Sequence, residues 1–365
     1  LLSVHDRTGR KYAFSERSGG MKYFLSYFVQ ALAHKPAQGQ EILLMDEPDA
    51  FLSTAGQQDL LRLFDSFAYP EDPAQRPLQV LYVTHSPFLI DKNHGERLRV
   101  LEKGDGEEGT RVVRNAAQNH YEPLRSAFGA FVAETTFIGN CNLFVEGQAD
   151  QVLLAGMSSL SLRLRKQAET LDLNTLTLVP AGGASHIPYL VYLARGRDID
   201  KPAVIVLLDG DKAGEDAKRE LQRGYRKKRL VADRHVLHLG DLPLDQLSID
   251  TDGVRDLEDL VPADVALVAI GKCAEEALGD DAPTVLTALK PFSVPTGQKL
   301  FAAAEQAAVD ASGSLDRPLT LDKVAFARAV VEATAQATAE VQDRILGNFH
   351  VLFARLAEMQ RNSMS

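Results

Sequence analysis

The sequence is poor in cysteine: only Cys141 and Cys273 occur among 365 residues, and no Cys-x-x-Cys spacing is present. This scarcity argues against a disulfide framework or a structural zinc site, and it fits a reducing cytoplasm. The sequence also lacks any apolar run that reaches the ~20 residues of a membrane span. We therefore expect a cytoplasmic protein with no membrane partner.

Basic residues are in the minority, since 40 Lys and Arg stand against 50 Asp and Glu and give a formal net charge of -10. This balance argues against a protein that coats DNA by bulk charge, but a DNA enzyme can concentrate basic residues locally. The length suggests two or three domains, and an apolar content of 45% is enough for their cores. The first residue is Leu1 rather than Met, so we expect a fragment whose targeting cannot be fully judged.

A third absence is the phosphate cradle Gly-x-x-x-x-Gly-Lys-Ser/Thr, which the sequence does not contain. Other parts of an ATP site are present. Residues 41–47 read as an apolar strand that ends in Asp46 and Glu47, the acids that P-loop ATPases place beside Mg²⁺ and the attacking water. Ser18-Gly19-Gly20 precedes a helical stretch whose first N–H groups can face a phosphate, and His85 follows a further strand.

In this order the pieces resemble the second half of an ABC-type ATPase of the SMC-like branch, within residues 1–115. The signature motif matches Ser18-Gly19-Gly20, Walker B matches Asp46-Glu47, and His85 matches the switch histidine. The resemblance implies that a partner subunit's cradle holds the nucleotide, and that the full-length protein forms a homodimer through this region. Because the cradle is absent, we expect ATP to matter only in the full-length protein and this chain to bind little of it.

Residues 135–265 alternate between strand-like and helix-like patterns. Such alternation with short links predicts a parallel sheet with helices on both faces, and ligands bind such sheets at the carboxyl ends of their strands. The strands are expected near 142–146, 175–179, 203–208 and 234–239, and the helices near 148–166, 185–196 and 212–229.

Acidic residues follow two of these strands. The run Asp209-Gly210-Asp211 comes directly after one, and Glu146 ends another, with Asp150 four residues further on where a helix begins. Alternate side chains of an Asp-x-Asp run point the same way, and residues four apart share a helix face. Mg²⁺ prefers such hard oxygen ligands, and two ions roughly 4 Å apart can hydrolyse a phosphodiester. Each acidic run taken alone can equally be a solvated turn.

The segment resembles a TOPRIM domain, whose first motif matches Glu146-Gly147 and whose DxD motif matches Asp209-Gly210-Asp211. An SMC-like ATPase half joined to a TOPRIM domain resembles the OLD (overcoming lysogenisation defect) nucleases, over about residues 10–265. That resemblance implies an endonuclease of phage defence that acts on DNA with two Mg²⁺ or Mn²⁺ ions. It implies one ion on Glu146 and Asp150, a bridging Asp209, and a second ion on Asp211 and Glu258. A solvated helix surface is the other reading of the segment around Glu258.

Residues 266–365 carry helical apolar spacing at 265–278, 300–311 and 322–360, which predicts a packed helical domain. OLD nucleases have a helical addition with a lysine that assists catalysis. Lys299 is the best match and Lys290 the rival, although a solvated lysine is the commoner reading of either.

Basic residues cluster after the Asp-Gly-Asp run. Beside a carboxylate metal site such a cluster predicts contact with DNA phosphates and little sequence specificity, although most basic runs are solvated helix faces. The candidates are Arg223, Arg226, Lys227, Lys228 and Arg229.

Two alternatives to the endonuclease remain open at this point. A topoisomerase or primase can share the TOPRIM domain, but Tyr121 and Tyr189 lack any motif of a nucleophilic tyrosine. A non-catalytic, ATP-gated DNA clamp could use the acidic residues for structure only.

Overall fold

The computed structural model places the chain in two compact units, Leu1–Asp91 and Lys92–Ser365. In the described residues no helix is long and apolar enough to cross a membrane. Cys141 and Cys273 are buried free thiols. The structure describes residues 3–5, 10–13, 19–33, 41–50, 52–70, 72, 76–84, 86–94, 97–99, 101–103, 109–112, 141–164, 166, 168–195, 202–224, 229, 231–289, 292–313, 315 and 318–364.

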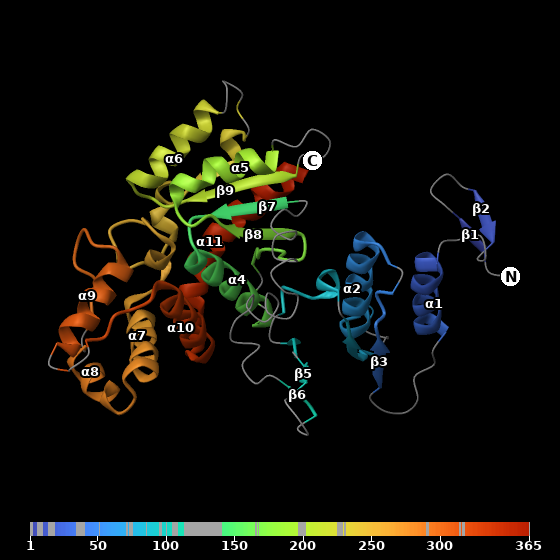
Figure 1. Ribbon diagram of the computed structural model, residues 1–365, viewed down its shortest axis with the longest axis horizontal. Coiled ribbons are helices and arrows are strands. Elements are labelled where there is room, and N and C mark those ends of the chain that lie inside the picture. Colours follow the sequence, from blue (N-terminus) through green and yellow to red (C-terminus); the bar gives the residue numbers. More distant parts are fainter. Residues whose placement is uncertain are drawn as a thin grey trace. The chain divides into compact units, whose positions relative to one another are not determined.

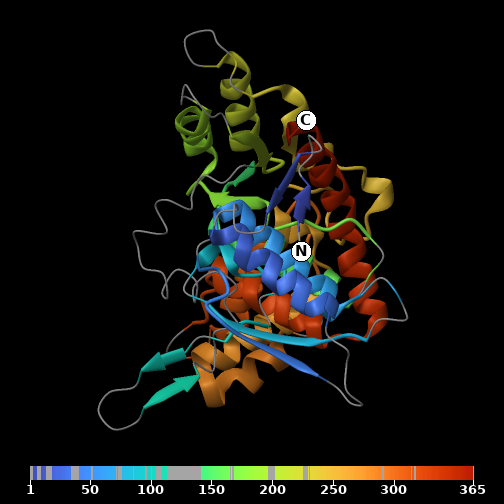
Figure 2. The same ribbon diagram turned by 90° about the vertical axis from the view of Figure 1, so that its right-hand side faces the viewer.

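In the first unit, two parallel strands pair in register, with Asp46 opposite Val83. Helix α2 packs under them on a small core of Leu60, Phe64 and Leu89, and its N-cap Ser53 accepts a hydrogen bond from the Gly56 N–H. Helix α1 lies beside α2 (Figure 2). The elements are β1 Ser3–His5, β2 Lys11–Ala13, α1 Gly19–Ala33, β3 Ile42–Asp46, α2 Thr54–Ala68 and β4 Gln79–Val83.

The second unit is built on a four-stranded parallel sheet in the order β10-β9-β7-β8. The central strands β7 and β9 are buried along their whole length, because helices cover both faces, and this is why they read as unbroken apolar runs. An antiparallel pair, β5–β6, precedes the sheet. The strands are β5 Leu101–Lys103, β6 Thr110–Val112, β7 Cys141–Val145, β8 Leu176–Pro180, β9 Ala203–Leu208 and β10 Val236–His238.

Helices α5 and α6 cover one face of this sheet, while α4 and α11 cover the other (Figure 1). The predicted mixed α/β fold, with parallel strands and a helical stretch at the end, is confirmed. The helices are α4 Gln148–Arg163, α5 Ile187–Arg195, α6 Lys212–Arg223, α7 Ala263–Leu278, α8 Ala282–Ala288, α9 Leu300–Ser312, α10 Lys323–Gln336 and α11 Ala339–Met364.

Two predicted helices differ in extent from the observed ones. The helix expected at 212–229 ends at Arg223, because Gly224 takes a φ of 66° that glycine adopts without steric cost. The stretch expected at 322–360 is two helices, α10 and α11, separated at Ala337. Short 3-10 helices occupy Pro87–Leu89, Ala184–His186, Asp233–His235, Leu239–Asp241, Leu244–Gln246, Leu257–Leu260 (η9) and Gly279–Asp281.

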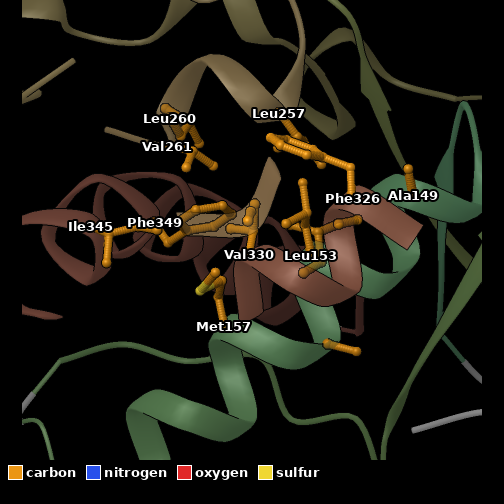
Figure 3. Packing of buried hydrophobic residues seen from close by; sticks show 14 of the residues in the cluster. Ala149, Leu153, Met157, Leu257, Leu260, Val261, Phe326, Val330, Ile345 and Phe349 are labelled. Carbon is orange, nitrogen blue, oxygen red and sulfur yellow. The ribbon is translucent and has the colours of Figure 1, made fainter. Parts of the chain in front are cut away.

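One hydrophobic core joins the sheet to the later helices. Figure 3 shows Leu153 and Met157 of α4 facing Val330 of α10 and Phe349 of α11, all of them buried. Residues on both sides of the predicted boundary at 265 thus share a core, and the domain boundaries at 115, 135 and 265 stay predictions.

Candidate active site

The acidic residues that follow β7 and β9 meet at one edge of the sheet. The two strands are direct neighbours, with Phe144 opposite Val206. The Asp209 N–H donates a hydrogen bond of 2.8 Å to Glu146 Oε1. The turn after β8 also lies here, since the Gly183 N–H donates to the Glu146 carbonyl at 2.8 Å. The carboxyl ends of three parallel strands therefore frame Glu146, as the alternating pattern predicts.

The Asp-Gly-Asp turn is held by the backbone of a distant segment. The Gly210 N–H donates to the Arg255 carbonyl at 2.6 Å. A Cβ at position 210 would lie 2.9 Å from the Gly240 nitrogen and still closer to the Val254 carbonyl oxygen. Only glycine leaves room for this approach, so the residue between the two acids is set by packing.

Asp211 caps helix α6 and pairs with a lysine. Its Oδ1 accepts hydrogen bonds from the N–H groups of Ala213 and Gly214, at 3.0 and 3.1 Å. Lys299 Nζ donates to its Oδ2 at 3.0 Å. Burial alone would raise the pKa of Asp211, but the Lys299 and backbone donors outweigh it and lower that pKa. Asp211 is therefore ionised at neutral pH and confined to one orientation.

Asp150 lies in the first turn of α4 and is almost fully buried, with 4% of its surface exposed. Its Oδ2 accepts a hydrogen bond of 2.7 Å from the Gly147 N–H. Burial is the main cause that raises the pKa of Asp150, while nearby Lys323 acts in the opposite direction. The structure thus brings Asp150 into the same electrostatic environment as Glu146 and Asp209.

The segment around η9 adds two more buried acids. Glu258 has no exposed surface, and Lys323 Nζ lies 3.1 Å from its Oε2. Asp256 faces two lysines, because Nζ of Lys299 and of Lys323 lie 3.7 and 3.9 Å from its Oδ2. Within the described part of the chain, Asp256 Oδ1 and both oxygens of Glu258 lack a hydrogen bond of acceptable geometry. Lys323 therefore acts on Glu258 through its nearby positive charge rather than through a well-aligned hydrogen bond.

Asp259 has a different role from its acidic neighbours. It accepts hydrogen bonds from the N–H groups of Arg255 at 2.8 Å and Leu300 at 2.7 Å. Because Leu300 directly follows Lys299, this buried carboxylate ties the loop that carries the lysine to η9.

The acids strongly affect one another's protonation. Burial, followed by repulsion from Asp150 and Glu146, raises the pKa of Asp209 to about 9. Burial, opposed by Lys323 and reinforced by Asp256, raises the pKa of Glu258 to about 8. Both carboxyl groups therefore hold a proton more tightly than an ordinary carboxyl group does.

Two observations bear on whether this cluster suits a metal ion. In the part of the chain that the structure describes, no group of three or more His, Cys, Asp or Glu side chains is already arranged to hold one. The donor set is nevertheless made of hard oxygens, and three of these oxygens are buried without a hydrogen-bond partner in the described residues. Such atoms are costly unless a cation or donor joins them, so the chemistry of the cluster fits divalent ions.

The sequence predicts most of this cluster but misses Lys323 and Asp256 as members. Lys323 is the first residue of α10, and its position is fixed by the packing of that helix. No local signal identifies it, since a lysine at the start of a helix is ordinary. Asp256 could have been found, because it belongs to the same acidic run as Glu258.

The ATPase motifs are described in part. Gly19 and Gly20 begin α1, and Asp46 ends β3 as predicted. Glu47 lies in a left-handed turn with a φ of 43°, a strained conformation for a residue other than glycine. The predicted Ser18 and His85 lie outside the described residues.

The predicted DNA-contacting cluster is also only partly described. Arg223 is exposed at the end of α6, and Arg229 donates to Asp233 Oδ2 at 2.9 Å. The remaining predicted residues Arg226, Lys227 and Lys228, together with the rival lysine Lys290, lie outside the described residues.

The chain is similar to a family model, to a curated nuclease and to a solved structure. Residues 2–91 match the family model of an AAA domain, putative AbiEii toxin, Type IV TA system. A stretch of 171 residues, 45% of this chain, is 28% identical to an OLD nuclease of Thermus scotoductus (strain ATCC 700910 / SA-01). The chain spans 30% of that relative's length. The C-terminal region of the Burkholderia pseudomallei OLD protein matches over 62% of this chain and 100% of its own, at 17% identity and a TM-score of 0.34.

The predicted resemblance to OLD nucleases is confirmed by the Thermus homologue, and the AAA match fits the predicted ATPase half.

Proposed function

We propose that this relative of the OLD nucleases is a metal-dependent DNA endonuclease whose active site is the acidic cluster of a TOPRIM domain. The observation that carries the proposal is the meeting of Glu146 and Asp209 at the carboxyl ends of adjacent parallel strands. Asp211, Asp150 and Glu258 extend the same cluster from α6, α4 and η9. This is the arrangement that the Glu and DxD motifs of a TOPRIM domain would produce.

Glu146, Asp150, Asp209, Asp211 and Glu258 are the residues that would hold two Mg²⁺ or Mn²⁺ ions. Such ions would activate water and stabilise the leaving oxygen of a phosphodiester. The hydrogen bond from the Asp209 N–H fixes the direction of the Glu146 carboxylate. The backbone donors of α6 do the same for Asp211.

Lys299 would act beside these acids as a phosphate-binding cation. Its ammonium is part-exposed and 3.0 Å from Asp211 Oδ2, so it faces both the acids and the solvent from which DNA would arrive. Pairing with Asp211 outweighs burial and raises the pKa of Lys299, so its charge is retained throughout the neutral range. A retained positive charge stabilises the extra negative charge of a phosphodiester under attack.

In the full-length protein we propose ATP-coupled cutting by a homodimer that forms through the ATPase region. The AAA match over residues 2–91 supports this coupling. DNA as substrate rests on the similarity to a protein named an OLD nuclease.

The test is incubation of supercoiled plasmid with the protein and Mg²⁺ or Mn²⁺. Nicked and linear products that disappear with a chelator are expected. Asp209→Asn should reduce cutting by about 100-fold, because an amide cannot ionise and become the anionic oxygen ligand that a divalent ion requires. Asp216→Asn is the matched control, since Asp216 is an exposed acid of α6 paired with Arg219.

Each other outcome has a defined meaning. Resealed topoisomers would replace the endonuclease with a topoisomerase. An unchanged plasmid with either metal would favour the non-catalytic clamp. Normal cutting by a folded Asp209→Asn protein would remove Asp209 from the site.

A further inference from the structure

We infer that Lys299 and Lys323 are counter-ions of the acidic cluster that compete with divalent ions for it, and that Asp256 is the positioning residue that retains both lysines. The inference rests on the proposed metal site, and it assigns roles to Lys323 and Asp256 that the motifs do not give. It concerns how the metals gain access to their ligands.

The two lysines contact the oxygens that metal ions would need. Lys299 Nζ is 3.0 Å from Asp211 Oδ2, and Lys323 Nζ is 3.1 Å from Glu258 Oε2. At these distances each ammonium repels a divalent ion that approaches the same carboxylate. Metal binding at Asp211 and Glu258 is therefore strengthened when each ammonium moves away.

Asp256 provides the place to which both can move. Its Oδ2 lies 3.7 Å from Lys299 Nζ and 3.9 Å from Lys323 Nζ, so it already attracts both. Its Oδ1 is buried and has no hydrogen-bond partner in the described residues. A short shift would bring either ammonium into full hydrogen bonding with Asp256. The lysines would then stay charged and close to the metals instead of swinging into solvent.

The lysines reach Asp256 from two different elements. Lys299 is the N-cap residue of α9, and Lys323 is the first residue of α10. Their side chains are about one-third exposed, at 31% and 37%, whereas Asp256 is 5% exposed. The fixed member of the trio is therefore the carboxylate, and the movable members are the ammonium groups.

Calorimetric titration of the whole chain with Mn²⁺ tests the inference. Lys299→Met and Lys323→Met should each bind Mn²⁺ at least about 5-fold more tightly than the unchanged protein, because a competing cation is gone. Lys272→Met is the matched control: Lys272 pairs with Glu332 on α10 at 2.9 Å, outside the cluster. Its Mn²⁺ affinity should not change.

The variant Asp256→Asn distinguishes two roles of Asp256, that of a positioning residue and that of a metal ligand. It should weaken Mn²⁺ binding in the unchanged background, because the lysines then remain on Asp211 and Glu258. In the Lys299→Met/Lys323→Met background the same change should have little effect. An equal loss in both backgrounds would make Asp256 a direct ligand and overturn its proposed role.

Thermal unfolding is the control for correct folding: each variant should unfold cooperatively, and the rise in its unfolding temperature with Mn²⁺ is measured. Lys323→Met removes the neighbour of a fully buried Glu258, so Lys299→Met on the exposed loop serves as the second, milder variant. If the unchanged protein binds no Mn²⁺, the proposed metal site fails. If it binds but the lysine variants match Lys272→Met or bind more weakly, the inference of competing lysines alone fails.

Discussion

At Gly210 the backbones of two other segments, around Gly240 and Val254, approach so closely that no side chain fits. The Val254 carbonyl and the Gly240 nitrogen fill the space of a side chain, while the Gly210 N–H donates to Arg255. Backbone contacts with these segments thus fix the turn that carries Asp209 and Asp211, and the geometry of the turn depends on residues far away in the sequence.

Gly210→Ala should therefore destabilise the protein by about 1–3 kcal/mol and reduce plasmid cutting, because the new methyl group forces the turn to shift. Urea unfolding and the nicking assay measure the two effects. Gly253→Ala is the control, since a Cβ there meets nothing within 4 Å. Equal stability of the two variants would show that the turn accommodates a methyl group freely.

Residue patterns identify the acids of the site but not its lysines. Glu146 and Asp209 are predictable because an apolar run marks each strand and the acid follows where the strand ends. Lys323 is not predictable in this way, since only the packing of α10 brings it to Glu258. Lys299 is predicted by resemblance to a family rather than from its own surroundings.

At the scale of elements, the site depends on the contact between α4 and α10. Helix α4 carries Asp150 and α10 begins with Lys323. A Cβ at Gly156 would lie 2.5 Å from Val331 Cγ2, so the two helices approach as closely as a glycine allows. The distance between the two charged residues is therefore set by a helix contact that lies about two turns away from them.

Gly156→Ala should destabilise the protein, because the methyl group overlaps the branched side chain of Val331. Val331→Ala should relieve that overlap, so the double variant should be more stable than the two single changes predict, with a coupling of about 1–2 kcal/mol. Chemical denaturation of the four proteins in the cycle measures it. Strict additivity would mean that the helices separate at no cost.

Element boundaries show what periodicity leaves undetermined. The charged sequence beyond Arg223 continues a plausible helix, yet Gly224 ends α6 through its backbone conformation. The break between α10 and α11 falls in a region of helical spacing without glycine or proline, so apolar periodicity alone runs across it. The boundaries of strands β7 and β9 are easier to predict, because burial on both faces leaves an unbroken apolar run in the sequence.

At the scale of the whole molecule, the buried acids make stability depend on pH. The folded pKa values of Asp209 and Glu258, about 9 and about 8, lie above their ordinary values of 3.8 and 4.5. At pH values between the ordinary and the raised pKa values, the folded protein binds more protons than the unfolded one, so the free energy of unfolding falls as pH rises. Asp211, whose pKa is lowered, acts in the opposite sense but only in the acidic range.

We expect the metal-free protein to lose stability steadily from pH 5.5 to pH 8.5, and excess Mg²⁺ to reduce that loss by binding the ionised acids. Urea unfolding at several pH values, with chelator or with Mg²⁺, measures both effects. Asp209→Asn removes one titrating group and should flatten the metal-free profile. A metal-free profile that is flat or rises with pH would contradict the protonated state of these acids.

Asp259 joins the two halves of the site, since it binds the backbone of η9 on one side and the start of α9 on the other. The acids come from the strand ends, from the starts of α4 and α6 and from η9, whereas the lysines come from the starts of α9 and α10. Because each lysine lies against an acid of the other group, we expect neither group to keep its charge balance if exchanged between relatives on its own. A substitution that alters the charge of one group should require a compensating substitution in the other. We therefore expect the two groups to be inherited together.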